Sequence, residues 1–333
     1  RPPPSKKRNE LTMTMTSSPD DPSSRPSKTL FSKDGVSLLA TTLRRDDDDD
    51  DDDVSSSHDG IILTLTLNRQ HEKNVINPTI ISLINQALDI IDSHPMLVDT
   101  NNKSLIITGL NLGNDDNNAQ PASSKSKFFS NGLDLEWFLK APRTKDNPNP
   151  TASVIESYNS HILARVLTLP FRTIAAINGH CIGAGLFLAL ACDYRIMRTK
   201  RGYLQWPEAK LGMRLTKGFA ELSKAKIGNG YGAGGGGASA SDHHVLREGI
   251  LTAKMYNSTE ALNSGIIDAV CDVEKLYSEA FRMAMEGLPE SNTGMNLEYF
   301  DPKAWTEIKI EMYTDAYRAL RFGKVEDLPS SRI

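Results

Sequence analysis

The chain has 333 residues, of which 39% are hydrophobic and 24% charged, a composition typical of soluble globular proteins. Its formal net charge of −4 would be +4 without the eight consecutive aspartates at 46–53, a balance that identifies no partner by itself. No apolar run reaches the ~20 residues of a membrane span, the three cysteines lack the spacing of a zinc site, and no basic–aromatic stripe points to nucleic acid. We therefore expect a soluble protein with no metal, no membrane span and no nucleic-acid partner.

The chain opens with a segment that is rich in proline, serine and charge. Residues 1–28 have little to bury, so we expect a disordered tail, and because the chain does not begin with Met, a targeting remnant and a plain tail both stay open. The stretches 36–44 and 60–69 are rich in Val, Ile, Leu and Thr and predict a strand hairpin. The Asp-rich insertion 45–58 between them predicts a solvated tip.

Helix and strand patterns alternate further along the chain. Residues 77–92 predict a helix with Asn77 as its N-cap, 104–110 predicts a strand, and 152–168 predicts another helix. The stretch 111–127 is polar and of low complexity, which indicates an enlarged surface loop.

The second half repeats the alternation, which predicts a mostly parallel α/β sheet with crossover connections. Strands are predicted at 171–178, 194–199 and 266–271, and helices after a Ser258 cap and over 305–323. The Gly-rich segment 228–244 is interpreted as a flexible insertion, because no strand precedes it and no Lys-Ser/Thr follows the glycines of a phosphate cradle. We expect one core domain at 29–273, followed by a C-terminal helical segment and tail at 274–333.

Two segments are suited to presenting backbone N–H groups to a ligand. One is Phe128–Leu135 (FFSNGLDL), and the other is the glycine turn at 179–185 ahead of an apolar helix. If the two turns converge, they would hold one negatively charged oxygen, with each donor contributing roughly 3 kcal/mol in a transition state. Taken separately, each turn is equally typical of a tight connection from strand to helix.

Five motifs resemble one known family. LTLNRQHEKNVIN, FFSNGLDL, PFRTIAAINGHCIGAGLFLALACDYRIMR, LQWPEAKLGM and LTAKMYNSTEALNSGIIDAV have the order and spacing of the crotonase (enoyl-CoA hydratase/isomerase) superfamily. The resemblance covers roughly residues 31–273 and is greatest to Δ3,Δ2-enoyl-CoA isomerases of the plant and algal peroxisomal type. It implies an α/β fold, a crotonase-like spiral of ββα units with C-terminal helices, assembled as a homotrimer or hexamer. It also implies an acyl-CoA substrate and no cofactor, since coenzyme A is part of the substrate.

The resemblance also assigns roles to residues. The backbone N–H groups of Asn131 and Ala184 take the positions of the two oxyanion-hole donors. Residues in contact with the substrate or its coenzyme A are expected at Ser130, Gly132, Leu133, Gly183, Phe187, His71 and Lys73. For His71 and Lys73, solvated side chains are an equally good interpretation.

One carboxylate is expected to carry the chemistry. Hydratases of the family use two glutamates; here one position holds Phe187, which moves no proton, and the other holds Glu208. Shifting a double bond from position 3 to position 2 of an acyl-CoA needs only one mobile proton, and burial of Glu208 should raise its pKa. The open alternative for Glu208 is a surface carboxylate that pairs with Lys210.

Other polar and aromatic residues near these motifs have structural interpretations. We expect Asp134 to cap a helix, Asp193 to make structural hydrogen bonds and His180 to be a packed or surface imidazole. The large residues Tyr203, Leu204 and Trp206 are equally typical of an acyl pocket and of the core.

The sequence therefore predicts an enoyl-CoA isomerase of β-oxidation, with other crotonase chemistry (hydration or hydrolysis) and a non-catalytic acyl-CoA-binding scaffold as alternatives. The terminal Ser331-Arg332-Ile333 resembles the peroxisomal address that the import receptor reads. We expect a peroxisomal protein, with the mitochondrion or plastid as alternatives.

Overall fold

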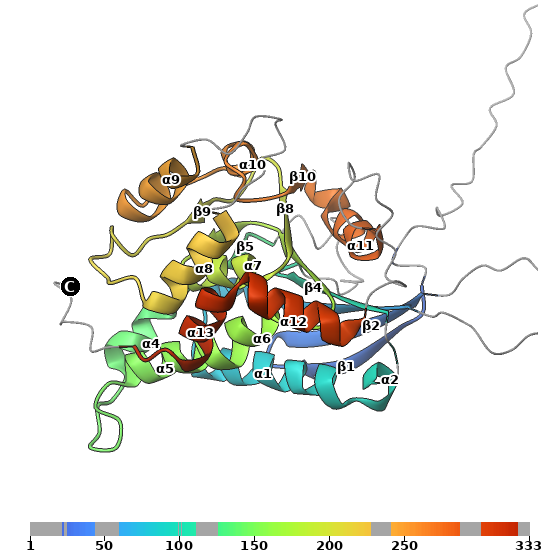
Figure 1. Ribbon diagram of the computed structural model, residues 1–333, viewed down its shortest axis with the longest axis horizontal. Helices are drawn as coiled ribbons and strands as arrows, with labels where there is room; N and C mark the ends of the chain where they lie inside the picture. Colours follow the sequence, from blue (N-terminus) through green and yellow to red (C-terminus); the bar gives the residue numbers. More distant parts are fainter. Residues whose placement is uncertain are drawn as a thin grey trace, which may run out of the picture.

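The computed structural model describes residues 22, 25–43, 60–98, 100, 102–110, 126–227, 241–286 and 301–325. Most of the predicted tail, the whole Asp-rich insertion, most of the other two insertions and the terminal tripeptide lie outside these residues, so those predictions are not addressed. The described helices and strands surround two sheets (Figure 1).

The larger sheet has seven strands in the order β1-β2-β3-β4-β6-β8-β10. Its strands are β1 (Ser27–Lys33), β2 (Val36–Leu43), β3 (Gly60–Leu67), β4 (Lys103–Thr108), β6 (Arg172–Ile177), β8 (Tyr194–Arg198) and β10 (Ala269–Cys271). The pairs from β3 through β10 are parallel, while β1-β2 and β2-β3 are antiparallel. The predicted hairpin and the predicted parallel sheet are thus both confirmed.

Two elements of the sheets were not anticipated. Strand β1 pairs with β2 through a turn at Asp34-Gly35, where both residues have positive φ, which is a recognised hairpin signal. A second sheet, β5-β7-β9, consists of the short parallel strands β5 (Phe128–Ser130), β7 (His180–Ile182) and β9 (Leu204–Gln205). It matters for function because all three of its strands lead directly into the loops described below.

The larger sheet buries both of its faces. Along β3, Leu63 and Leu65 point into the main hydrophobic cluster, whereas Ile62 points into a second one. This alternation is the two-residue period of a strand, and it lets helices cover each side. Helix α11 (Leu276–Glu286) packs on one face, and α1 (Pro78–Ser93) lies against the other (Figure 1).

The remaining helices follow the sheet in chain order. They are η2 (Gln70–Glu72), α2 (Pro95–Val98), α4 (Leu135–Lys140), α5 (Pro150–Tyr158), the π-helical turn η3 (Asn159–Leu163), α6 (Ala164–Leu167), α7 (Ala184–Ala191), α8 (Lys217–Ile227), α9 (Ser241–Leu246), the π-helical turn η4 (Arg247–Leu251), α10 (Ser258–Asn263), η5 (Val273–Lys275), α12 (Pro302–Met312) and α13 (Thr314–Phe322).

Three details of the helices differ from the predictions. The cap of α10 is Asn257 rather than Ser258, because Asn257 and Glu260 form a reciprocal capping box. The helical pattern at 305–323 is two helices, which meet at Tyr313. Helix α11 lies after the boundary predicted at residue 273, yet it covers strands β4, β6 and β8 of the core. The predicted cap of α1 is confirmed, since the Asn77 side chain accepts from Ile80 N.

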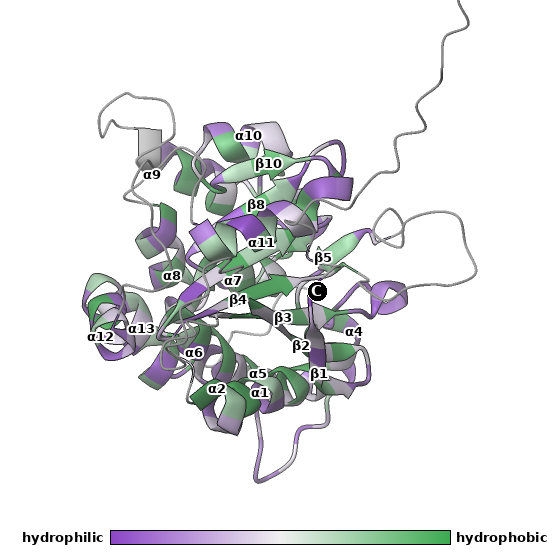
Figure 2. Cartoon of the chain, turned by 90° about the vertical axis from the view of Figure 1, so that its right-hand side faces the viewer, coloured by the Kyte–Doolittle hydropathy of each residue, from purple (hydrophilic) through white to green (hydrophobic). Residues whose placement is uncertain are grey.

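Hydropathy follows this arrangement. Green, hydrophobic residues concentrate in the strands and in α7, while α12 and α13 at the edge show polar outer faces (Figure 2). In the described part of the chain, no helix has the length and apolar character needed to cross a membrane.

Candidate active site

Helix α7 is the most completely buried helix of the site. All eight of its residues are buried, so it is held by packing on every side. Gly183 precedes it with φ +50°, a conformation that L side chains rarely adopt, and no side chain caps the helix N-terminus. The turn at Gly183 therefore presents the first amides of α7 without a competing side-chain acceptor.

The two turns predicted to converge are in contact. A Cβ added to Gly132 would lie 2.8 Å from the Ile182 carbonyl oxygen and 3.4 Å from the Ala184 nitrogen. A Cβ added to Gly185 would lie 2.6 Å from that of Ser130. Only glycine fits at either contact, and the close approach brings the amides of the two turns to one place.

The amides at this place differ in whether they are already used. The Asn131 N–H donates to the Lys73 carbonyl at 3.0 Å, and the Gly132 N–H donates to Ser130 Oγ at 3.2 Å. Within the described residues, neither the Leu133 N–H nor the Ala184 N–H has an acceptor. The geometry therefore favours Leu133, two residues after the predicted Asn131, as the partner of Ala184.

Glu208 follows β9, three residues after Gln205, and its side chain faces the turn at Gly183. The carboxylate oxygen Oε1 would lie 3.9 Å from a Cβ added to Gly183, while the ring of Pro207 lies against the same glycine. Glu208 is only 9% exposed, and among the described residues its Oε2 has no hydrogen-bond partner. Burial raises the pKa of the Glu208 carboxyl to about 7, opposed in part by a hydrogen bond from its own backbone.

This placement decides between the two interpretations of Glu208. Lys210 is exposed, and Glu208 makes no ion pair with it or with any other described cation. The interpretation as a surface carboxylate is therefore wrong, and Glu208 is a buried acid beside a turn of free amides.

The aromatic residues near Glu208 belong to the core. Phe187 is 0% exposed and stacks on Phe219 of α8 with ring centroids 4.0 Å apart. Trp206 and Leu204 are equally buried, and Trp206 Nε1 donates to Ser223 Oγ. Phe187 thus places a packed ring, rather than an acid, on the side of α7 that faces α8.

Tyr203 lies at the opposite end of the second sheet. It precedes β9, whereas Glu208 follows it, and Tyr203 is 40% exposed beside His180, with ring centroids 5.8 Å apart. Both line a cavity of about 540 Å³ with residues 200–202 and 257–260. His180 is thus a packed imidazole, as predicted, and burial lowers its pKa.

The two tempting aspartates are structural, as predicted. Asp134 caps α4 by accepting from Trp137 N, and its other oxygen accepts from Asn77 Nδ2. Asp193 accepts from the backbone and hydroxyl of Thr173 and from Lys309 Nζ at 2.7 Å. These partners leave Glu208 as the acid placed at the converging turns.

The turn that carries His71 and Lys73 lies beside the site. Both side chains are exposed, and His71 Nε2 lies 3.2 Å from Glu72 Oε1. Lys73 touches the site through its carbonyl, which holds the Asn131 amide. Contacts of these side chains with coenzyme A stay a prediction.

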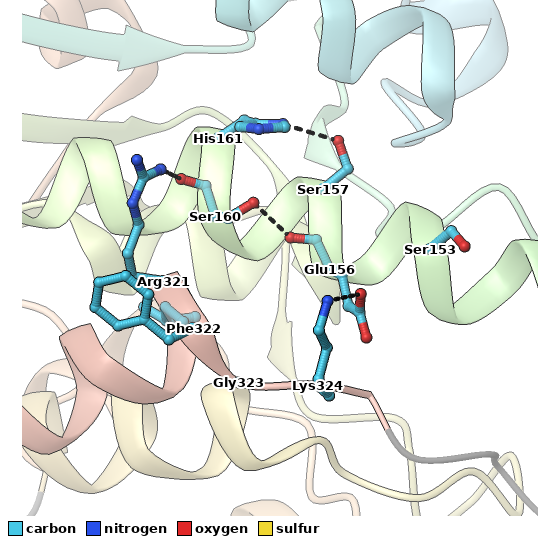
Figure 3. A pocket seen from close by; sticks show the side chains of 10 residues that line it. Ser153, Glu156, Ser157, Ser160, His161, Arg321, Phe322, Gly323 and Lys324 are labelled. Atoms are coloured by element: carbon cyan, nitrogen blue, oxygen red, sulfur yellow. Dashed lines mark hydrogen bonds and ion pairs between the residues drawn. The ribbon is translucent and has the colours of Figure 1, made fainter.

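A separate cavity of about 480 Å³ lies between α5, η3 and the end of α13 (Figure 3). Its charged side chains already have partners: Lys324 Nζ lies 3.3 Å from Glu156 Oε2, and Arg321 donates to the Ser160 carbonyl. Ser157 Oγ and His161 Nδ1 are 3.1 Å apart. Because the cavity contains none of the residues of the converging turns, we assign it no role in the site.

The described residues hold no group of three or more His, Cys, Asp or Glu side chains suited to a metal ion. Residues 57–296 match the protein-family model for enoyl-CoA hydratase/isomerase. The chain belongs to this family.

Two sequence relatives and one solved structure illustrate the membership. The chain is 33% identical to the peroxisomal enoyl-CoA delta isomerase 2 of Arabidopsis thaliana over 212 residues, which is 63% of this chain and 73% of that protein. It is 27% identical to the mitochondrial methylglutaconyl-CoA hydratase of Homo sapiens over 244 residues, 71% of this chain and 59% of that protein. The human mitochondrial delta3-delta2-enoyl-CoA isomerase superposes with a TM-score of 0.55 at 19% identity, covering 78% of this chain and 82% of that one. The crotonase-like fold expected from the motifs is confirmed.

Sequence reasoning missed several residues that shape the site. The side chains of Gln70 and Asn74 bind the backbone on either side of β5, and the buried Tyr158 hydroxyl donates to the Ala184 carbonyl at 2.7 Å. A signal was present for Asn74, because a buried Asn between a strand and a helix is suited to the left-handed conformation that it adopts here. No local pattern singles out Gln70 or Tyr158.

Proposed function

We propose that the protein is an acyl-CoA double-bond isomerase, which converts 3-enoyl-CoA to 2-trans-enoyl-CoA in the β-oxidation of unsaturated fatty acids. The observation that carries the proposal is the state of Glu208, a single buried carboxyl with a pKa of about 7 beside two converging turns. A base that titrates near neutral pH can both take and return a proton.

The chemistry follows from this arrangement. The Glu208 carboxylate removes a proton from C2 of the 3-enoyl thioester, and the electrons move onto the thioester oxygen. The resulting dienolate oxygen accepts hydrogen bonds from the amides of Leu133 and Ala184, with each donor contributing about 3 kcal/mol. The protonated Glu208 then delivers the proton to C4, which leaves the double bond at position 2.

The reassignment from Asn131 to Leu133 is part of the proposal. An amide that already donates to the Lys73 carbonyl would have to lose that bond before it could bind an oxyanion, whereas the Leu133 amide has no acceptor to lose. Preorganised donors stabilise developing charge without reorganisation.

Hydration is the second candidate, supported by the resemblance to methylglutaconyl-CoA hydratase. Adding water across a double bond is assisted by two carboxylates, and the position that would supply the second holds the buried ring of Phe187. The structure thus offers less support for hydration than for isomerisation, and a non-catalytic scaffold has no need of a carboxyl buried at this cost.

Incubation with each substrate in turn tests the proposal. We expect 3-enoyl-CoA to be converted to 2-enoyl-CoA, and 2-enoyl-CoA to give little 3-hydroxyacyl-CoA, as followed by chromatography of the acyl-CoA products. Rapid formation of 3-hydroxyacyl-CoA from 2-enoyl-CoA would instead identify a hydratase, and no turnover of either would favour a scaffold.

Location and assembly complete the proposal. Peroxisomal import rests on the terminal Ser331-Arg332-Ile333 and on the name of the Arabidopsis relative. A fluorescent protein carrying the last ten residues should enter peroxisomes, and one lacking the terminal tripeptide should not. A homotrimer or hexamer is expected from the family, and sedimentation of the full chain tests it.

A further inference from the structure

Three side-chain amides converge on one backbone oxygen next to the site. The Phe128 carbonyl lies 2.8 Å from Gln70 Nε2, 3.0 Å from Asn74 Nδ2 and 3.1 Å from Asn178 Nδ2. The Phe128 amide is held as well, because it donates to Gln70 Oε1 at 3.0 Å. Both polar groups of this residue are thus fixed, one of them by three donors.

Gln70 makes four hydrogen bonds that join two distant parts of the chain. Its Nε2 also donates to the Gly109 carbonyl at 2.8 Å, and its Oε1 also accepts from Lys127 N at 2.9 Å. Gly109 precedes the segment 111–125 and Lys127 follows it. One carboxamide therefore closes the chain across this segment.

The held residue leads directly into the loop of free and used amides. Phe128 begins β5, and Ser130 Oγ donates to the Asn74 carbonyl at 2.7 Å just after it. Asn131 N donates to Lys73, so the loop is bonded at successive residues to the same turn that carries Gln70. The direction of the Leu133 amide is thereby set by the turn at 70–74.

We propose that Gln70 is a positioning residue for the amide of Leu133, and that it makes the site independent of the segment 111–125. This inference rests on the proposed function for its catalytic readout. Gln70 does not touch the reacting atoms; it fixes the start of β5, and the rest of the loop follows. Displacing a catalytic group by about 1 Å can lower a rate about 100-fold, so loss of the tie should appear in kcat.

The variant Gln70→Met tests the proposal, because methionine has a similar length and makes none of the four hydrogen bonds. We expect kcat for 3-enoyl-CoA to fall at least tenfold, with KM changed less than threefold, at a temperature where the variant is fully folded. The matched control is Gln86→Met, since Gln86 is exposed on α1 and its amide bonds only Ser82 Oγ among the described residues. Its kcat should stay within threefold of the wild type. A fall of less than tenfold for Gln70→Met overturns the proposal.

A spectroscopic measurement separates this role from general stability and from the proposed function. The infrared carbonyl band of bound 2-enoyl-CoA should shift to lower frequency in the wild type, because amides polarise the thioester, and should shift less in Gln70→Met. An unchanged shift overturns the positioning role. If the wild type binds 2-enoyl-CoA but isomerises nothing, the proposed function fails, and the carbonyl shift still decides the role of Gln70.

A second variant covers the outcome that Gln70→Met does not fold. Replacing residues 112–124 with Gly-Ser leaves Gln70 and its four partners in place. We expect kcat within threefold of the wild type, because the tie holds Phe128 whatever the length of the segment. A larger fall would show that the segment itself positions the loop, and would overturn the proposal.

Discussion

At the scale of single residues, Glu208 is in an environment that opposes its charge. Its carboxyl is buried, one of its oxygens lacks a hydrogen-bond partner among the described residues, and burial raises its pKa to about 7. Such a group destabilises the fold when ionised, and it is suited to accept a proton from a weakly acidic carbon.

The pH dependence of catalysis should therefore show one ionisation. We expect kcat/KM for 3-enoyl-CoA to fall tenfold per pH unit below about 7 and to level off above it, because the carboxylate form of Glu208 starts the reaction. Initial rates between pH 5 and 9 check this. A bell-shaped profile, with a second essential acid, would favour the hydratase.

The same pKa predicts a trade-off in stability. Glu208 has a higher pKa in the folded chain than its ordinary value of 4.5, so between pH 4.5 and about 7 the folded state holds a proton that the unfolded state has lost. Stability due to this group falls across that window and stays low above it. Glu208→Gln should therefore unfold with a free energy higher by about 1–3 kcal/mol at pH 8, and by nearly nothing at pH 4. Urea titrations at both pH values measure the difference. An equal effect at the two would contradict the assignment.

Sequence reasoning located the acid but not the donor. Glu208 and Ala184 could be carried over from motifs, because their places follow from chain spacing. Whether Asn131 or Leu133 offers a free amide depends on which carbonyls the turn at 70–74 places opposite them, and that is set by tertiary contacts.

At the scale of elements, the loop after β5 and the turn before α7 fit together only through glycine. Gly132 has φ +86°, and a Cβ there would approach the Ile182 carbonyl oxygen to 2.8 Å. We expect Gly132→Ala to lower kcat at least tenfold and the free energy of unfolding by about 1–3 kcal/mol, because both backbone strain and a backbone clash arise.

The matched control for that variant is Gly265→Ala. Gly265 also has positive φ, at +66°, but a Cβ there would meet no atom within 4 Å. It should lose stability by about 1 kcal/mol through strain alone and keep its kcat. Kinetics and denaturation of both variants check this, and equal losses of kcat would contradict a specific role for Gly132.

Elements were predictable where local chemistry decides them. Helix α1 shows its cap and its apolar spacing directly, and the parallel strands of the larger sheet are rich in β-branched residues. The second sheet could not be predicted, because β5, β7 and β9 are two or three residues long and exist only through their pairing with each other.

At the scale of the whole molecule, one buried lysine attaches the C-terminal helices to the core. Lys309 of α12 donates to the carbonyls of Leu169 and Phe171 and to Asp193. Burial lowers the pKa of Lys309, and the neighbouring Asp193 partly opposes this. Helix α13 then packs on α8, which carries Phe219 against Phe187.

Removing this lysine should loosen the C-terminal helices. We expect Lys309→Met to lower the free energy of unfolding by about 2–4 kcal/mol, because Asp193 loses a buried partner. Proteolysis within residues 301–325 should become faster. Lys303→Met, at an exposed position 3.9 Å from Glu307, should change stability by less than about 0.5 kcal/mol. Similar effects of the two variants would contradict the attachment.

The global arrangement was only partly visible in the sequence. One core domain of alternating strands and helices could be predicted from the pattern. That α11 covers a face of the larger sheet could not, since its apolar residues Leu276, Phe281 and Met283 show an amphipathic helix but not its partner.

The turnover of 3-enoyl-CoA by Glu208→Gln tests the central claim most directly. Glutamine keeps the shape of the side chain and cannot accept the proton from C2, so kcat should fall by about 1,000-fold or more while the acyl-CoA still binds. A variant that forms 2-enoyl-CoA at a rate within tenfold of the wild type would show that another group moves the proton, and would contradict the account.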